Sequence, residues 1–296
     1  MTTTANTLGL SQWSFHRSIL GQVRDNYEQY LSLLHSSNPD QVLQGDLNCF
    51  EFLDLAYLLD VNHVDPVNIL FFSKVNDRNW LNQWKQYAQN LNIRFECLMC
   101  DELGNLGDAN PAARLHAIAM HKPWIDAAAT LGCSMVRVNT YGSGSYLQQL
   151  YANRDSLREL AIYAKTLQVK LVIENHGHPS SNAAWLAMLI EAVDMDNVGV
   201  YLDLDNFFMG GWHHTPQRRY DRIQGIEDLA PYTFAVSAKS YDFDQHGQET
   251  SVDYAACIQT LNKHQFKGIY AAEFEGDNLS EMEGTQATLA LLSQLI

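Results

Sequence analysis

The chain has 296 residues, of which 46% are hydrophobic, and a formal net charge of −15 at pH 7. This length and composition fit one large globular domain over residues 1–296, and the negative charge argues against a surface that binds nucleic acid. No apolar stretch approaches the roughly 18 to 20 residues that a membrane span needs.

Cysteine content and the first residues bear on the compartment. The five cysteines are an odd number, which argues against a disulfide framework. Met1–Thr7 is polar and lacks the charged and apolar regions of a signal peptide, so we expect a frayed segment ahead of the first strand. These features predict a cytoplasmic protein, with neither a nucleic acid nor a membrane as its partner.

Apolar segments rich in β-branched or aromatic residues recur along the chain and predict eight strands. Most lack strict alternation of apolar and polar residues, which is typical of parallel strands buried on both faces. The expected strands are Leu8–Trp13, Pro66–Phe72, Ile93–Met99, Met135–Asn139, Lys170–Ile173, Val198–Leu202, Phe234–Ala238 and Gly268–Phe274.

Helix signals stand between these strands. Asn110-Pro111 combines an N-cap with proline at the first helical position, which predicts a helix through Ala129 that Gly132 terminates. Thr215-Pro216 repeats this start signal and predicts a helix over Gln217–Ala230.

Further helices complete the alternation. Ser280 and Glu283 form a capping box for a last helix to Ile296. Helical spacing of apolar residues is also found in Asn153–Gln168 and in Asn182–Val193. In Tyr27–Leu59, where the pattern is weaker, we expect the first helix and an insertion around Ser36–Asn48. Eight strand–helix units predict an α/β fold, a single-domain (β/α)8 TIM barrel. A doubly wound open sheet is disfavoured, because no Gly-rich phosphate turn follows the first strand.

Four of the predicted strands run directly into residues that bind metals or move protons. Successive runs are about 30 to 35 residues apart, roughly one strand–helix unit. Parallel barrel strands deliver their C-terminal ends to one face, so the runs predict a single shared site. They are Ile173–Gly177, Leu202–Asn206, Val236–Lys239 and Ala272–Gly276.

Three carboxylates in these runs, Glu174, Asp203 and Glu273, suit Mg²⁺ or Mn²⁺, and Zn²⁺ if an imidazole joins them. Such an ion would polarise a carbonyl and its neighbouring hydroxyl and stabilise the enediolate that forms when an α-proton leaves. Glu174 and Glu273 would then exchange protons with carbon. The alternative is that each acid caps a helix or pairs with Arg or Lys.

Several runs between Pro123 and Gly276 occur together in one order. They are Trp124–Ala129, Leu131–Cys133, Val136–Asn139, Glu174–Gly177, Asp203 with Asn206, the strand of Lys239, Tyr241–Asp244 and Glu273–Gly276. With them the chain resembles the sugar phosphate isomerase/epimerase family of xylose-isomerase-like TIM barrels. The first 120 residues match this family only loosely.

The resemblance implies a divalent metal, Mn, Mg or Zn, held by Glu, Asp, His and Glu from strands five to eight. By position these are Glu174, Asp203, Ser237 and Glu273, so Ser237 replaces the family histidine. A serine hydroxyl is a poor ligand beside imidazole. The metal is then retained on three carboxylates and water, completed by another histidine, or lost. The candidate histidines are His176, His213, His214 and His246.

Other polar and aromatic residues near the strand ends are candidates for binding substrate. For Lys239 the alternative is a buried ion pair with Glu273 or Asp203, and Glu275 is a candidate to support the site. The candidate substrate-binding residues are His176, Lys239, Arg137, Asn139, Asn206, Trp13 and His16.

Two functions stay open at this point. The first is a metal-dependent isomerase or epimerase that acts on a small sugar, sugar acid or polyol through an enediolate. The second, favoured by Ser237, is a metal-free barrel that binds a sugar or a protein partner without turnover. A further function, metal-dependent phosphodiester hydrolysis, is disfavoured by the negative charge and by the missing histidines. Aromatic-rich helix surfaces allow a homodimer.

Overall fold

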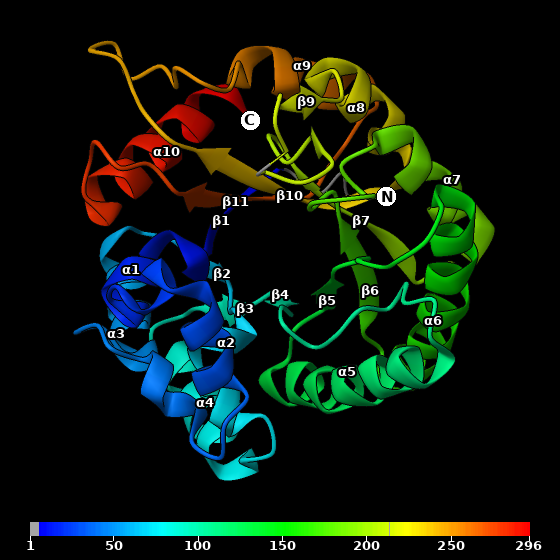
Figure 1. Cartoon of the computed structure of the whole chain (residues 1–296). Coiled ribbons are helices and arrows are strands. Elements are labelled where there is room, and N and C mark those ends of the chain that lie inside the picture. Colours follow the sequence, from blue (N-terminus) through cyan, green and yellow to red (C-terminus); the bar gives the residue numbers. More distant parts are fainter. Residues whose placement is uncertain (1–5, 213) are drawn as a thin grey trace.

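The computed structural model describes residues 6–212 and 214–296. In it, parallel strands curl into a ring and helices surround that ring (Figure 1). The nine-stranded sheet has the order β3-β2-β1-β11-β10-β7-β6-β5-β4. Its strands are β1 (Thr7–Ser11), β2 (His63–Asp65), β3 (Arg94–Phe95), β4 (Cys97–Met99), β5 (Met135–Val138), β6 (Lys170–Glu174), β7 (Val198–Asp203), β10 (Thr233–Ser240) and β11 (Ile269–Phe274).

The third barrel strand is interrupted at Glu96, which separates β3 from β4. β3 pairs with β2, whereas β4 pairs with β5. An isolated parallel bridge between Val67, just after β2, and Met99 of β4 closes the sheet across this interruption. Counted as one interrupted strand, β3 and β4 bring the barrel to eight, which confirms the predicted (β/α)8 fold.

Helices connect the strands and cover the outside of the barrel (Figure 1). Asn110 caps α5, Gly132 ends it with φ 89°, and Ser280 with Glu283 forms the capping box of α10, all as predicted. A two-stranded hairpin of β8 (Phe208–Met209) and β9 (Arg218–Arg219) follows β7. The helices are α1 (His16–Leu20), α2 (Tyr27–Leu34), α3 (Cys49–Leu58), α4 (Arg78–Asn90), α5 (Pro111–Leu131), α6 (Tyr146–Thr166), α7 (Ala183–Val193), α8 (Arg222–Leu229), α9 (Tyr254–Lys263) and α10 (Glu281–Leu295).

The two-residue period of the strands sorts side chains between the helix layer and the barrel interior. Val200 and Leu202 of β7 belong to the large apolar cluster, which also holds the buried helix residues Trp84 and Trp124. Tyr201, between them in the sequence, packs in the second cluster with strand residues such as Val172 and Ala235. By the same alternation Glu174, Asp203, Ser237, Lys239 and Glu273 face the interior.

The predicted second strand, Pro66–Phe72, is wrong. The strand is His63–Asp65, and the segment after Pro66 forms two short 3₁₀ turns, Asn68–Leu70 and Phe72–Lys74. Pro66 has no N–H to donate to a ladder, and the real strand is only three residues long with two polar members. Its apolar signal is therefore weaker than that of the turn that follows it.

Two helix starts also differ from expectation. The helix predicted over Gln217–Ala230 begins at Arg222, where Asp221 accepts the capping hydrogen bond, and Thr215-Pro216 lies in the preceding loop. The helix predicted over Asn153–Gln168 begins earlier, at Tyr146, because Ser145 and Gln148 form a capping box.

The start of the chain also differs from expectation: Thr7 is already in β1, and Met1–Ala5 lie outside the described residues. No helix among the described residues has the length and apolar character to cross a membrane.

Candidate active site

Three buried carboxylates lie inside the barrel at the C-terminal ends of their strands. Glu174 ends β6, Asp203 ends β7 and Glu273 lies near the end of β11. Their exposed fractions are 1%, 0% and 3%. Glu174 and Glu273 line a cavity of about 960 Å³ that opens at this end of the barrel. Strand ends thus bring together the three acids that the sequence singled out.

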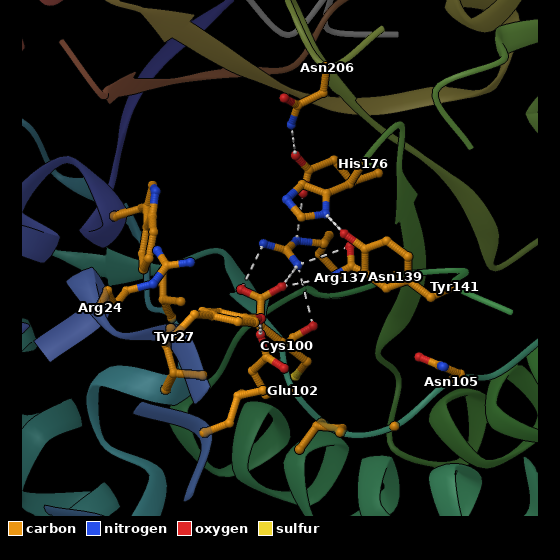
Figure 2. Close-up of a pocket in the computed structure, with 18 of the residues that line it drawn as sticks. Arg24, Tyr27, Cys100, Glu102, Asn105, Arg137, Asn139, Tyr141, His176 and Asn206 are labelled. Atoms are coloured by element: carbon orange, nitrogen blue, oxygen red, sulfur yellow. Dashed lines mark hydrogen bonds and ion pairs between the residues drawn. The ribbon is translucent and has the colours of Figure 1, made fainter. Parts of the chain in front are cut away.

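Two buried basic side chains pair with these acids. Lys239 Nζ lies 3.2 Å from Asp203 Oδ2, 3.1 Å from Glu273 Oε1 and 3.4 Å from Glu275 Oε1. Arg137 Nε lies 2.9 Å from Glu174 Oε2. The same guanidinium donates from Nη1 to Asp101 Oδ1 at 2.6 Å (Figure 2). The acids are therefore held by ion pairs within the protein.

The turn after β7 fixes two of the carboxylates. Asp203 Oδ1 accepts hydrogen bonds from the backbone N–H groups of Asp205 (2.7 Å) and Asn206 (2.8 Å). The Asn206 side-chain amide donates to Glu174 Oε1 at 2.9 Å and to Asp203 Oδ2 at 3.1 Å. Asn206 therefore orients the carboxylates of two neighbouring strands relative to each other.

Negative charge is in excess around these pairs. Among the described residues, five acids, Asp101, Glu174, Asp203, Glu273 and Glu275, form ion pairs with two cations, Arg137 and Lys239. Burial raises the pKa of Glu174 to about 7, and burial also raises the pKa of Asp203. Burial acts on Asp101 too, but Arg137 holds its pKa at about 2. The site can therefore take additional positive charge.

The donor atoms suit a hard divalent cation, although they are not gathered around one point. Within residues 6–212 and 214–296, no three His, Cys, Asp or Glu side chains are grouped so that they could hold a metal ion. Lys239 stands between Asp203 and Glu273 instead. However, Ser237 Oγ and Glu273 Oε2 are buried without a hydrogen-bond partner among the described residues. Buried oxygens and surplus negative charge are what such an ion requires.

None of the described alternative histidines supplies the missing imidazole. His214 is partly buried in the loop after β8, where Nδ1 is 2.8 Å from the Pro216 carbonyl oxygen, and His246 is exposed. His213 lies outside the described residues. His176 lies beside the cavity, and its Nδ1 is 2.7 Å from the Tyr141 hydroxyl.

His176 and Tyr141 form one wall of the cavity (Figure 2). The His176 ring packs edge-on against Trp212, with centroids 4.8 Å apart. Burial, aided by Arg137, lowers the pKa of His176 to about 3, so the imidazole is neutral at pH 7. A neutral imidazole beside a tyrosine hydroxyl can donate a hydrogen bond to a sugar hydroxyl or accept one from it.

Trp13 and His16 occupy different places. The Trp13 ring lines the large cavity, and its Nε1 donates to Glu275 Oε1 at 2.5 Å. His16 stacks on Trp13 with centroids 4.3 Å apart and lines a smaller cavity of about 280 Å³ next to Arg17. Among the described residues, Trp13 is thus placed for direct contact with a molecule in the large cavity, whereas His16 supports Trp13.

Sequence reasoning missed Asp101, Tyr141 and Arg24, all of which line the large cavity. Asp101 follows β4 closely, so the strand-end argument could have found it. It also accepts from Asn139 Nδ2 at 2.7 Å, which ties Asn139 to Arg137. Tyr141 lies in a loop and Arg24 in a single 3₁₀ turn, Val23–Asp25, and neither has a spacing rule that would place its side chain.

A buried histidine on the cavity wall, His121, should make the free energy of unfolding depend on pH. His121 of α5 is buried, its Nδ1 donates to the Ala117 carbonyl at 2.7 Å, and burial lowers its pKa from 6.5 to about 4. As pH drops, His121 therefore takes up a proton in the unfolded chain before it does so in the folded one. The free energy of unfolding should fall between about pH 6.5 and about pH 4, and this group should contribute about 3 kcal/mol to the fall. Chemical denaturation across this range should show a shallower fall for His121→Gln, and equal slopes would contradict the assignment.

One comparison with known proteins identifies a family. A family model described as xylose isomerase-like TIM barrel matches residues 58–295. No curated protein sequence matches the chain.

Three solved structures share the fold. An IOLI protein with a bound zinc atom has 16% identity and a TM-score of 0.71, and the match covers 98% of this chain and 99% of that chain. D-psicose 3-epimerase from Clostridium cellulolyticum H10, solved with D-tagatose, has 12% identity and a TM-score of 0.70, with 98% and 99% covered. The 3-keto-D-glucoside 4-epimerase YcjR from E. coli has 16% identity and a TM-score of 0.64, with 84% and 95% covered.

The matched region of the family model contains every strand of the barrel except β1, together with Glu174, Asp203, Ser237 and Glu273. The chain therefore belongs to the xylose isomerase-like TIM-barrel family.

Proposed function

We propose that this protein is a metal-dependent isomerase or epimerase that acts on a small sugar, sugar acid or related polyol through an enediolate. The observation that carries the proposal is that two buried carboxylates, Glu174 and Glu273, line one cavity of about 960 Å³, with the buried Asp203 hydrogen-bonded to the same Asn206 amide as Glu174. Two structural relatives are named as sugar epimerases, and a third binds zinc, which supports this choice of reaction and cofactor.

Glu174, Asp203 and Glu273 would hold the cation, with Ser237 as a weak ligand or none. A divalent ion bound there supplies polarisation of the substrate carbonyl and of its neighbouring hydroxyl. The surplus of carboxylates around Arg137 and Lys239 supports this assignment.

The side chains of this protein would carry out the proton transfer. Glu174 and Glu273 belong to strands separated by β7 and β10, so they approach the cavity from different parts of the ring. In our proposal one takes the α-proton and the other returns a proton to carbon. Asn206 keeps Glu174 oriented. His176 would position the sugar by hydrogen bonding, and Trp13 would contact it from the cavity wall.

A metal-free barrel that binds a sugar or a protein without turnover is the second candidate. It is favoured by two specific observations: Ser237 replaces the histidine, and Lys239 Nζ lies 3.1 to 3.2 Å from Glu273 and Asp203. In that case the Lys239 ammonium supplies the positive charge that a metal ion would otherwise bring to the carboxylates.

Metal content separates the two candidates. Protein purified without chelator should contain about one Mn, Mg or Zn per chain by elemental analysis, and Asp203→Asn should lose it because a carboxylate ligand becomes an amide. Asp196→Asn is the matched control, since Asp196 pairs with Lys165 at an exposed site. Wild-type protein that holds no metal and takes up no Mn²⁺ would contradict the proposal and favour the metal-free binder.

A further inference from the structure

We infer that Arg24 forms an anion subsite of the large cavity, so that the molecule bound there carries a carboxylate or a phosphate. The inference rests on the proposed function for the identity of that molecule as a sugar. It narrows the substrate class from sugars in general to acidic or phosphorylated sugars.

Aromatic rings hold the Arg24 guanidinium in place. Its Cζ lies 4.7 Å from the centroid of the Trp13 ring, 5.6 Å from that of Tyr30 and 5.9 Å from that of Tyr27. These cation–π contacts supply no hydrogen-bond acceptor, so they do not use the N–H donors of the guanidinium. Arg24 and Tyr27 lie across the cavity from His176 and Tyr141 (Figure 2).

Arg24 lacks the partners that the other basic residues of this cavity have. Arg137 and Lys239 each contact at least two carboxylates. Within the described part of the chain, Arg24 makes no hydrogen bond and has no carboxylate within 4.0 Å, and its buried Nε has no acceptor. A charged group with unused donors on a cavity wall is a binding site for an anion, because carboxylate and phosphate match its fork of donors.

The position of Arg24 fits one end of a sugar whose other end reaches the acids. A single indole ring separates the guanidinium from the acid cluster: Trp13 stacks on Arg24 and donates to Glu275 at 2.5 Å, and Glu275 is 3.4 Å from Lys239 Nζ. A sugar lying along Trp13 would therefore place its terminal acidic group at Arg24 and its reacting carbon at the carboxylates.

The surrounding charge makes Arg24 necessary for such a ligand. The protein carries a net charge of −15, and Glu102 on the same cavity accepts a hydrogen bond from the Tyr27 hydroxyl at 2.5 Å. The other two basic side chains of this cavity, Arg137 and Lys239, are already paired with carboxylates, so among the described residues Arg24 is the cation left to attract an anionic group. Loss of the guanidinium should therefore remove the preference for anionic sugars altogether, rather than weaken it slightly.

Three ligands that differ only at carbon 6 test the subsite: D-glucose, D-glucuronate and D-glucose 6-phosphate, with D-fructose and D-fructose 6-phosphate as a second series. Isothermal titration calorimetry on the wild-type protein should show at least one anionic ligand binding about 10- to 100-fold more tightly than its neutral parent. Arg24→Gln should reduce its affinity to that of the parent, and Arg24→Lys should retain part of the preference. Arg78→Gln, at an exposed arginine of α4, is the matched control.

The outcomes separate the subsite from the proposed reaction. Preference for the uronate points to sugar acids, and preference for the phosphate points to sugar phosphates; either supports the subsite when Arg24→Gln abolishes it. Equal binding of neutral and anionic sugars, or a preference that survives Arg24→Gln, overturns the subsite and leaves the proposed reaction standing. Binding that depends on Arg24 without any proton exchange in D₂O overturns the reaction alone. No binding by any of these sugars overturns both.

Discussion

Glu174→Gln should lower kcat/KM for an accepted sugar by about 10²- to 10⁴-fold, the range expected when a positioned acid–base group is removed. The amide keeps the shape of the side chain, and its oxygen still accepts from Asn206, but it cannot take a proton from carbon. The measurement is kcat/KM together with the incorporation of deuterium from D₂O at the α-carbon, followed by NMR.

The control for this experiment is Glu159→Gln, at an exposed glutamate of α6 that pairs with Lys122 at 2.8 Å. Its kcat/KM should equal that of the wild type. Metal content of Glu174→Gln is measured in parallel, so that loss of a ligand is distinguished from loss of the proton carrier. Wild-type rates of deuterium exchange in Glu174→Gln would show that Glu174 moves no proton, and another group would have to be sought.

The sequence predicted the barrel and the acids of the site because both follow from strand patterning. Glu174, Asp203 and Glu273 come at the ends of long buried strands, and alternation along each strand leaves them facing inward. The second barrel strand escaped prediction, because three residues with polar members give little signal. Tyr141, in a loop, and Arg24, in a 3₁₀ turn, escaped for a different reason, since neither segment has a repeating period that would place its side chains.

The sequence also could not show which acidic and basic side chains pair with each other. Lys239 had two interpretations, contact with substrate or an ion pair with Glu273 or Asp203, and spacing alone could not choose between them. In the structure the ammonium lies among three carboxylates, one of them Glu275. The register of β10 against β11 explains this, because Lys239 is aligned with Glu273 across the ladder. Pairing across strands depends on that register, which the sequence does not state.

Lys239→Met should lower the free energy of unfolding by about 3 to 5 kcal/mol, because it leaves buried carboxylates without their cation. Lys239 is 4% exposed, and Asp203 and Glu273 are buried with it. Urea denaturation measures the loss. Lys165→Met is the matched control, since Lys165 pairs with Asp196 at 2.7 Å but both side chains are exposed, and its effect should stay within about 1 kcal/mol.

The same variant tests whether the carboxylates accept a divalent ion. Once the ammonium is gone, Mn²⁺ can balance the charge of Asp203 and Glu273, so added Mn²⁺ should stabilise Lys239→Met more than the wild type. At a concentration of 100 times Kd, the gain is about 2.7 kcal/mol, which recovers most of the loss. A variant that loses stability but gains none from Mn²⁺ would show that these acids serve Lys239 alone, and the metal-free binder would then be the better account of the site. Undiminished stability in Lys239→Met would contradict the buried ion pairs themselves.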